Sequence, residues 1–171
     1  AGTSAGGARP KLSVEHQGAT WLLKLPRTHD EWNHARVEAA MLDLAHAAGV
    51  DVPEHEVIEV AGRKSLLVKR FDRQRTGGGE LRHRAVSALS VFSAVADPRR
   101  IQSYGSYPEL ALQLARWGDR VVADRHQLFR RMVFNCLTGV TDDHERNHAL
   151  VAASEHFRLS PAYDLSPSAQ T

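Results

Sequence analysis

The chain has 171 residues, 42% of them hydrophobic, so it can bury a core without disulfides or a structural metal, and its single cysteine excludes an internal disulfide framework. Its 22 basic and 20 acidic side chains give a formal net charge of +2, a balance that neither requires nor excludes a nucleic-acid partner. No apolar run reaches the roughly 18 to 20 residues of a membrane span, and the N-terminus has no signal-peptide core. We therefore expect a cytoplasmic protein with no membrane partner.

The first part of the sequence predicts two strands followed by a helix. Short apolar runs at residues 11–14 and 21–25 flank a turn at Gln17 and Gly18. Residues 28–31, Thr-His-Asp-Glu, have the form of a capping box, which predicts a helix that begins there. Apolar residues then recur at helical spacing before a stop at Gly49, at Val37, Met41, Leu44 and Ala48.

The middle of the chain predicts a hairpin, a linker and then helices. Apolar runs at residues 56–60 and 65–71 flank the sequence Ala-Gly-Arg and favour a hairpin. Residues 74–80 contain three consecutive glycines and predict a flexible linker, after which the composition is helical to about Gly139. We therefore divide the chain into a strand-rich N-lobe, residues 1–73, and a helical lobe, residues 74–171.

The last predicted helix carries a broad apolar stripe that stops at Gly139 and consists of Leu128, Phe129, Met132, Val133, Cys136 and Leu137. Cys136 is expected to be a core thiol rather than a nucleophile, because the sequence places no basic partner beside it. Beyond this helix, residues 149–151 and 156–159 predict a short hairpin.

Three polar residues around that hairpin have the order of a phosphoryl-transfer site. Asp142 and Asn147 are five residues apart, and Asp164 follows the hairpin. In protein kinases one aspartate orients the acceptor hydroxyl, while an asparagine and a second aspartate hold Mg²⁺. The alternative is that Asp142 and Asp143 cap a turn after Gly139 and that Asp164 starts another turn, but the ordered set favours a kinase site. Asp143 is only four residues from Asn147, so we assign the base to Asp142 and a supporting or solvated role to Asp143.

Lys24 ends the apolar run that forms the second predicted strand, where its side chain would point inward. A buried lysine needs an anionic partner, and Glu38 lies on the predicted helix at the edge of its apolar stripe, near Leu42 and Ala45. A strand lysine paired with a helix glutamate positions phosphates in kinases. The alternative is a surface lysine at a strand end.

Two further segments are candidates for nucleotide contacts. Residues 4–11 contain glycines that would let backbone N–H groups approach phosphates, with Arg9 or Lys11 adding charge, although a disordered tail has the same composition. Residues 69–73 fall where a hinge between two lobes would read adenine, with Phe71 packed nearby. The alternative for residues 69–73 is an exposed, salt-bridged strand end.

His144 and His148 are four residues apart and could share a helix face, which with the nearby aspartates indicates a transition-metal site as an alternative. No third strong ligand stands at metal-site spacing. A His/Asp metal hydrolase is therefore the weakest of the functional interpretations.

The sequence resembles the HipA-like serine/threonine kinases. The matching motifs occur in family order over residues 4–166: Gly-Ala-Arg-Pro-Lys, Leu-Lys-Leu-Pro, Lys-Arg-Phe-Asp-Arg, Thr-Asp-Asp-His-x-x-Asn and Ser-Pro-Ala-Tyr-Asp-Leu. The resemblance implies an α+β, protein-kinase-like bilobal fold with a strand-rich N-lobe and a helical C-lobe. Family members are longer at both ends, so we expect a truncated C-lobe, with a fragment, a truncated gene product or an inactive remnant as the alternatives.

The resemblance also implies an ATP- and Mg²⁺-dependent protein kinase, the toxin of a toxin–antitoxin module. Its partners would be a protein substrate, with an aminoacyl-tRNA synthetase as the indicated class, and a HipB-like DNA-binding antitoxin through which DNA is met only indirectly. Ser4 falls where some members carry an autophosphorylated serine. The implied catalytic residues are Asp142, Lys24 and Glu38; the metal ligands are Asn147 and Asp164; the cofactor-binding residues are Ser4, Gly6, Gly7, Ala8, Lys11, Lys24, Lys69, Phe71 and His144.

A second hypothesis is a non-catalytic HipA-like module that retains the same core to bind nucleotide or an antitoxin. Mg²⁺-dependent phosphate transfer separates the two hypotheses.

Overall fold

The computed structural model of the chain describes residues 9–95, 106–152 and 155–167. Its N-terminal part is built on a four-stranded antiparallel sheet of β1 (Lys11–His16), β2 (Ala19–Lys24), β3 (His55–Val60) and β4 (Arg63–Lys69), in the order β1-β2-β4-β3. Both predicted hairpins are confirmed. Each turn has two residues with positive φ, Gln17 and Gly18 in the first and Ala61 and Gly62 in the second, which is the twist that two-residue hairpins favour.

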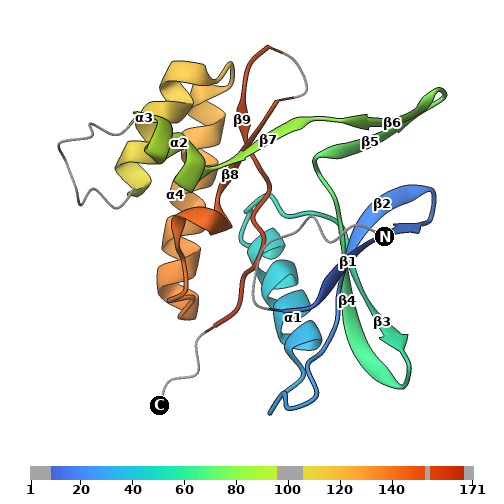
Figure 1. Cartoon of the computed structure of the whole chain (residues 1–171). Coiled ribbons are helices and arrows are strands. Elements are labelled where there is room, and N and C mark those ends of the chain that lie inside the picture. The colour runs from blue at the N-terminus through green and yellow to red at the C-terminus, as the bar shows by residue number, and fades with distance from the viewer. Residues whose placement is uncertain (1–8, 96–105, 153–154, 168–171) are drawn as a thin grey trace.

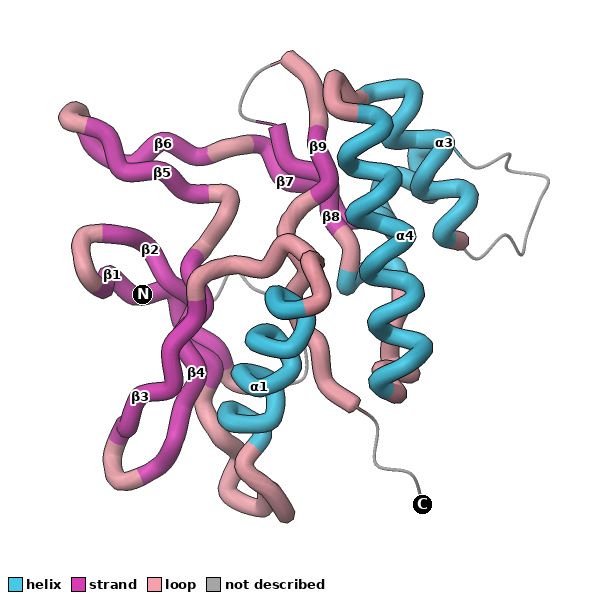
Figure 2. Tube along the Cα trace, turned by 180° about the vertical axis from the view of Figure 1, so that it is seen from behind, coloured by secondary structure: helices cyan, strands magenta, loops and turns pink. Residues whose placement is uncertain are grey.

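Helix α1 (His34–Ala47) packs against one face of this sheet, and Figure 2 shows it between the strands and α4. Leu42 and Ala45 of α1 are fully buried in one cluster with Leu66 and Val68 of β4. This cluster also includes Phe134 from α4 and residues of the C-terminal segment, so a single core joins the two parts of the chain.

The predicted start of α1 was wrong. The N-cap is Asn33, whose side chain accepts a hydrogen bond from the Arg36 N–H, and not Thr28. The capping-box residues instead form a loop, in which Asp30 accepts hydrogen bonds from Arg9 and from the Arg27 N–H. The predicted core position Leu44 is 51% exposed.

The predicted glycine linker is a β-hairpin. β5 (Arg73–Thr76) and β6 (Gly79–Arg82) pair in antiparallel register, and Gly77 and Gly78 form the turn between them. Figure 1 shows this hairpin projecting from the body of the molecule beside β2. Its strands are polar, so hydrophobic periodicity does not reveal them.

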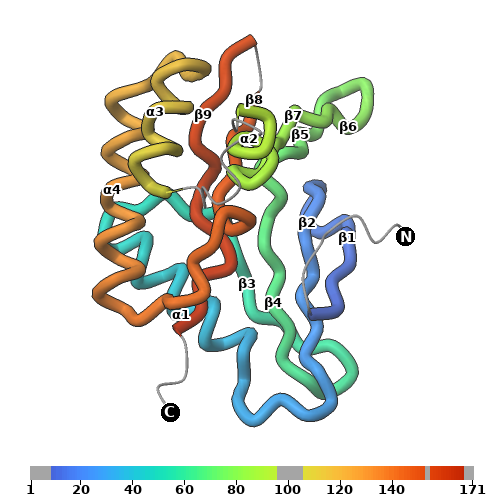
Figure 3. The backbone as a smooth tube through the Cα atoms, turned by 60° about the vertical axis from the view of Figure 1, so that its left-hand side comes forward, coloured from blue at the N-terminus to red at the C-terminus, as the bar shows by residue number. Residues whose placement is uncertain are grey.

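The composition predicted that the rest of the chain is helical to about Gly139. This prediction was wrong in part, because the region also contains strands. β7 (Arg84–Ser87), β8 (Ala149–Ala152) and β9 (Arg158–Leu159) form a three-stranded sheet, and β8–β9 confirms the predicted short hairpin. The helices α2 (Ala88–Val95), α3 (Tyr107–Trp117) and α4 (Val121–Thr138) pack beside it (Figures 1 and 3). The α+β class is confirmed, and no helix of the described residues is long and apolar enough to cross a membrane.

The face of α4 that is buried is not the face that its apolar pattern predicted. Leu128 and Phe134 are buried, but Phe129 and Leu137 are 61% and 82% exposed, and Cys136 is exposed, so the predicted core thiol was wrong. The buried face of α4 is instead partly polar, since it carries Asp124, Arg131 and Asn135. The predicted stop at Gly139 is confirmed by its left-handed conformation, with a φ of 70°.

Candidate active site

Three charged side chains from distant parts of the chain meet at the end of β2. Lys24 is its last residue, and Nζ of Lys24 lies 2.6 Å from Oε1 of Glu38 on α1 and 2.6 Å from Oδ1 of Asp164 in the C-terminal segment. The sequence predicted the Lys24–Glu38 pair, and the structure brings these residues together. The alternative of a surface lysine is wrong, because only 10% of the Lys24 side chain is exposed.

Burial and charge act in opposite directions on this cluster. Burial lowers the pKa of Lys24, but the carboxylates of Glu38 and Asp164 outweigh it and hold the pKa above its usual value. Burial raises the pKa of Glu38 against the opposing charge of Lys24. The pKa of Asp164 is lowered, because Lys24 outweighs the effect of burial there. A cationic Lys24 beside an ionised Asp164 is therefore the favoured state of the pair.

Asp164 is held in an unusual backbone conformation, with a φ of 58°. The preceding residue, Tyr163, stacks on Phe71 with ring centroids 5.7 Å apart, and its hydroxyl donates a hydrogen bond to the carbonyl of Arg146. Tyr163 therefore ties the segment of Asp164 both to the predicted hinge and to the segment that carries Asp142 and Asn147.

The segment from Asp142 to His148 turns sharply through a 3-10 helix, η1 (Glu145–Asn147). The Asn147 side-chain amide donates a hydrogen bond of 2.7 Å to the Asp142 carbonyl, which closes the turn; its Oδ1 has no partner among the described residues. The Asp142 side chain is 84% exposed, with His144 Nε2 3.8 Å away. Asp142 is thus presented to solvent next to an available amide oxygen.

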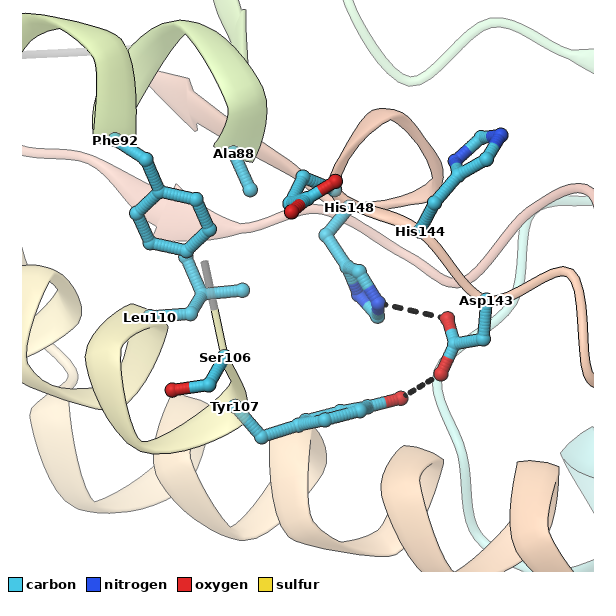
Figure 4. Close-up of a pocket in the computed structure, with 9 residues that line it drawn as sticks. Ala88, Phe92, Ser106, Tyr107, Leu110, Asp143, His144 and His148 are labelled. Atoms are coloured by element: carbon cyan, nitrogen blue, oxygen red, sulfur yellow. Dashed lines mark hydrogen bonds and ion pairs between the residues drawn. The ribbon is translucent and has the colours of Figure 1, made fainter. Parts of the chain in front are cut away.

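Asp143 points the other way. Its carboxylate is 14% exposed and accepts hydrogen bonds from the Tyr107 hydroxyl and from His148 Nε2, at 2.9 Å for the latter (Figure 4). Burial acts to raise the pKa of Asp143, but these hydrogen bonds outweigh it and lower the pKa to about 2. The solvated role considered for Asp143 is therefore wrong, and its supporting role stays a prediction.

Behind Asp143, Arg131 of α4 completes a buried network. Arg131 is 1% exposed; its guanidinium donates to the Ser160 carbonyl at 2.6 Å and lies 3.3 Å from Nδ1 of His148. Asn135 donates to the Tyr107 hydroxyl at 3.3 Å. Tyr107, Arg131 and Asn135 were not among the site residues predicted from the sequence. Asp124, Arg131 and Asn135 recur on one face of α4, and this polar periodicity within a helix was the signal available.

Both ring nitrogens of His148 are engaged, one with Asp143 and the other with Arg131, so His148 is not available as a metal ligand. His148 also lies outside η1, so the two histidines do not share a helix face. Within residues 9–95, 106–152 and 155–167, no three His, Cys, Asp or Glu side chains are grouped so that they could hold a metal ion.

The other predicted nucleotide contacts are placed as follows. Lys11 pairs in register with Lys24 across β1 and β2, and its charge helps to lower the pKa of Asp164. Lys69 ends β4, and its Nζ lies 2.6 Å from Glu54, so its side chain is paired with a surface carboxylate. Ser4, Gly6, Gly7 and Ala8 lie outside the described residues.

The segment after β4 is braced by ion pairs. Arg70 binds both carboxylate oxygens of Asp72, at 2.9 and 2.7 Å, and Arg73 lies 2.6 Å from Asp72 Oδ2. The Arg70 N–H donates to the Thr20 carbonyl on β2. The salt bridges expected of a strand end are present, but the side chains of Arg70, Asp72 and Arg73 are only 13–17% exposed, so the alternative of an exposed strand end is wrong.

Comparison with known proteins identifies the family. The model of the HipA-like C-terminal domain matches residues 3–171. The serine/threonine-protein kinase toxin HipA of Shewanella oneidensis is 26% identical over 184 residues, covering 95% of this chain and 42% of that protein. The chain spans between 37% and 52% of the length of four curated relatives that it matches.

Solved structures show the same fold. The Shewanella oneidensis HipA chain, in a complex of HipA, HipB and operator DNA, superposes with a TM-score of 0.75 at 23% identity, covering 96% of this chain and 43% of that one. The Helicobacter pylori proinflammatory kinase CtkA superposes with a TM-score of 0.73 at 16% identity, covering 94% of this chain and 54% of that one. The fold is therefore similar to that of these kinases.

Proposed function

This chain belongs to the family of HipA-like C-terminal domains, and from that premise we propose that it is the ATP- and Mg²⁺-dependent catalytic core of a protein serine/threonine kinase. The observation that carries the proposal is the position of Lys24 between Glu38 and Asp164. A buried lysine held by a helix glutamate and next to a metal-binding aspartate is the arrangement with which kinases position phosphates.

Each residue of the site has a distinct task in this proposal. Lys24 offers positive charge to the phosphates, and Glu38 holds its side chain in place. Asp142, exposed at the turn, orients the acceptor hydroxyl and accepts its proton as the hydroxyl oxygen bonds to the γ-phosphorus and ADP leaves. His144 lies beside Asp142 and is assigned to the nucleotide side.

The donor atoms at the site fit Mg²⁺. Asn147 offers an amide oxygen without a partner in the described residues and Asp164 offers a carboxylate of lowered pKa, and hard oxygen ligands are those that Mg²⁺ prefers. Asn147 and Asp164 would hold the ion, which when bound supplies positive charge to neutralise the phosphates.

The family also suggests a biological setting. The related Shewanella oneidensis protein is named as a kinase toxin, and its solved structure is a complex with HipB and operator DNA. We extend this to the present chain as the toxin of a cytoplasmic toxin–antitoxin module, with a HipB-like antitoxin through which it meets DNA. The protein substrate would be of the aminoacyl-tRNA synthetase class indicated by the family resemblance.

Transfer of label from γ-labelled ATP with Mg²⁺ to the purified chain, or to an added protein substrate, tests the kinase proposal. Wild-type protein should transfer label, and Asp142→Asn should lose transfer by about 100-fold or more, the range of general-base catalysis. Asp43→Asn, an exposed aspartate on α1, is the matched control and should retain transfer. Equal transfer by Asp142→Asn and wild type would contradict the role of Asp142. Mapping of the label would show whether Ser4 is modified.

A second candidate is a nucleotide- or antitoxin-binding module that keeps the paired Lys24, Glu38 and Asp164 but does not transfer phosphate. Such a module would be stabilised by ATP and Mg²⁺ in thermal unfolding, yet would transfer no label. Transfer by the wild-type chain would exclude it.

A further inference from the structure

A cavity of about 320 Å³ opens beside the segment that carries Asp142. Figure 4 shows it between α2, the start of α3 and the segment at Asp143. We call it the side pocket. Neither Lys24, Glu38 nor Asp164 lines it, so it is not the proposed phosphate site, but Asp143 and His144, the residues directly after Asp142, do.

One wall of the side pocket is apolar. Ala88 and Phe92 of α2 and Leu110 of α3 contribute side chains that are 0%, 8% and 2% exposed, and Figure 4 shows them facing the same space. These residues belong to the hydrophobic core of the helical part, so the wall is rigidly supported. It offers contact to the methylene groups of a side chain several carbons long.

The opposite wall carries two carboxylates, and one of them has no partner among the described residues. Asp143 and His148 are bonded to each other, and Tyr107 donates to Asp143. Glu145, which is half-buried, also lines the side pocket, and it has no hydrogen-bond or ion-pair partner in the described parts of the chain. A partly buried carboxylate without a partner attracts a cation or a hydrogen-bond donor.

We propose that the side pocket binds a basic side chain, arginine or lysine, of the acceptor polypeptide, next to the serine or threonine that is phosphorylated. The apolar wall suits the aliphatic stem of such a residue, and Glu145 suits its charged head. Arginine fits best, since its guanidinium can pair with a carboxylate through two hydrogen bonds. That the basic side chain belongs to the phosphorylated polypeptide rests on the proposed kinase function. That the side pocket binds a basic side chain does not depend on that function.

Binding can be tested without catalysis. N-acetyl-arginine amide and its uncharged isostere N-acetyl-citrulline amide are titrated into methyl-labelled protein, and the NMR signals of Ala88 and Leu110 are followed. The arginine derivative should produce saturable shifts at both methyl sites, and citrulline should bind at least about tenfold more weakly, as expected for the loss of one partly buried ion pair.

Glu145→Gln should reduce arginine binding to the level of citrulline, while Glu31→Gln, an exposed carboxylate in the loop before α1, should leave it unchanged. Absence of saturable shifts at Ala88 and Leu110, or equal binding of the two probes, would overturn the pocket assignment. These outcomes do not depend on whether the chain transfers phosphate.

The position next to the acceptor is tested with a peptide library that scans each site around a central serine. Wild-type protein should favour arginine or lysine at one position, and Glu145→Lys should replace that preference by aspartate or glutamate. Label transfer with no basic preference would overturn the placement and leave the kinase function standing. Arginine binding in the NMR titration without any label transfer would support the pocket and contradict the kinase function.

Discussion

Lys24 shows how a single residue can link sequence, folding and chemistry. A buried cation is costly unless it is paired, so the two carboxylates that lie 2.6 Å from Lys24 stabilise it whether or not the chain transfers phosphate. The Lys24–Glu38 pair could be predicted from the sequence, because both residues interrupt apolar patterns on elements expected to pack together. Sequence spacing could not show that Asp164 closes the cluster, since it lies 140 residues from Lys24.

Arg131 is the most deeply buried charged side chain of α4, and it joins His148 to the Ser160 carbonyl. Arg131→Ala should lower the free energy of unfolding by about 3–5 kcal/mol, because it leaves buried polar partners unsatisfied and opens a cavity. Urea denaturation would measure the change. The neighbouring Arg130 is exposed, so Arg130→Ala serves as the control and should change stability by less than about 0.5 kcal/mol. A cost for Arg131→Ala as small as that of the control would show that the network contributes little.

Asp143 makes stability depend on pH in a defined direction. Its pKa is about 2 in the folded state, where His148 and Tyr107 outweigh burial, against about 4 for an unfolded chain. A lowered pKa adds stability that is present above the unfolded value and lost as the pH falls towards the folded value, about 2 kcal/mol in all and roughly half of it by pH 3.

Asp143→Asn removes this titration. Urea unfolding followed from pH 5 to pH 3 should therefore show a stability gap between wild type and Asp143→Asn that narrows by about 1 kcal/mol. A gap that stays constant over this range would mean that Asp143 has an ordinary pKa in the folded state.

Among the helices and hairpins, the sequence predicted those that are specified by nearby residues, either by the residues of a turn or by the spacing of apolar side chains. The hairpins β1–β2 and β3–β4 each have a glycine with a left-handed conformation in the turn, and α4 ends at Gly139, which has the same conformation. The hairpin β5–β6 was missed, because its strands are polar and its Gly-rich turn also fits a linker. The prediction of the buried face of α4 was wrong, because polar side chains of the buried network, and not most of the apolar stripe, face the interior.

The start of α1 gives a direct test at this scale. Asn33→Ala should cost about 1 kcal/mol of stability, because it removes the acceptor for the Arg36 N–H at the helix N-terminus. Thr28→Ala should change stability by less than about 0.5 kcal/mol, although the sequence pattern had favoured Thr28 as the cap. Thermal or urea unfolding of the two variants would measure both values. A larger loss for Thr28→Ala than for Asn33→Ala would restore the original prediction.

In the whole molecule, the candidate site lies where three separate parts of the chain meet. The sheet supplies Lys24, α1 supplies Glu38, and the C-terminal segment supplies Asp164, while one hydrophobic cluster packs α1, β4, α4 and that segment together. Tyr163 adds a contact to Phe71 on one side and to Arg146 on the other. The sequence predicted Lys24, Glu38 and Asp164 as site residues, and the structure brings these three together. Their meeting depends on long-range packing that no local pattern encodes.

Calorimetric titration of ATP into the chain, with and without Mg²⁺, tests whether the buried cluster at Lys24 binds phosphate. If Lys24, Glu38 and Asp164 form a phosphate site, wild-type protein should bind ATP in a Mg²⁺-dependent manner. Asp164→Asn should bind at least about tenfold more weakly, since it removes a charge that both Lys24 and the metal use. The control Asp119→Asn, an exposed aspartate paired with Arg158, should bind like wild type. Failure of the wild-type chain to bind ATP with Mg²⁺, or equal binding by Asp164→Asn, would contradict the account.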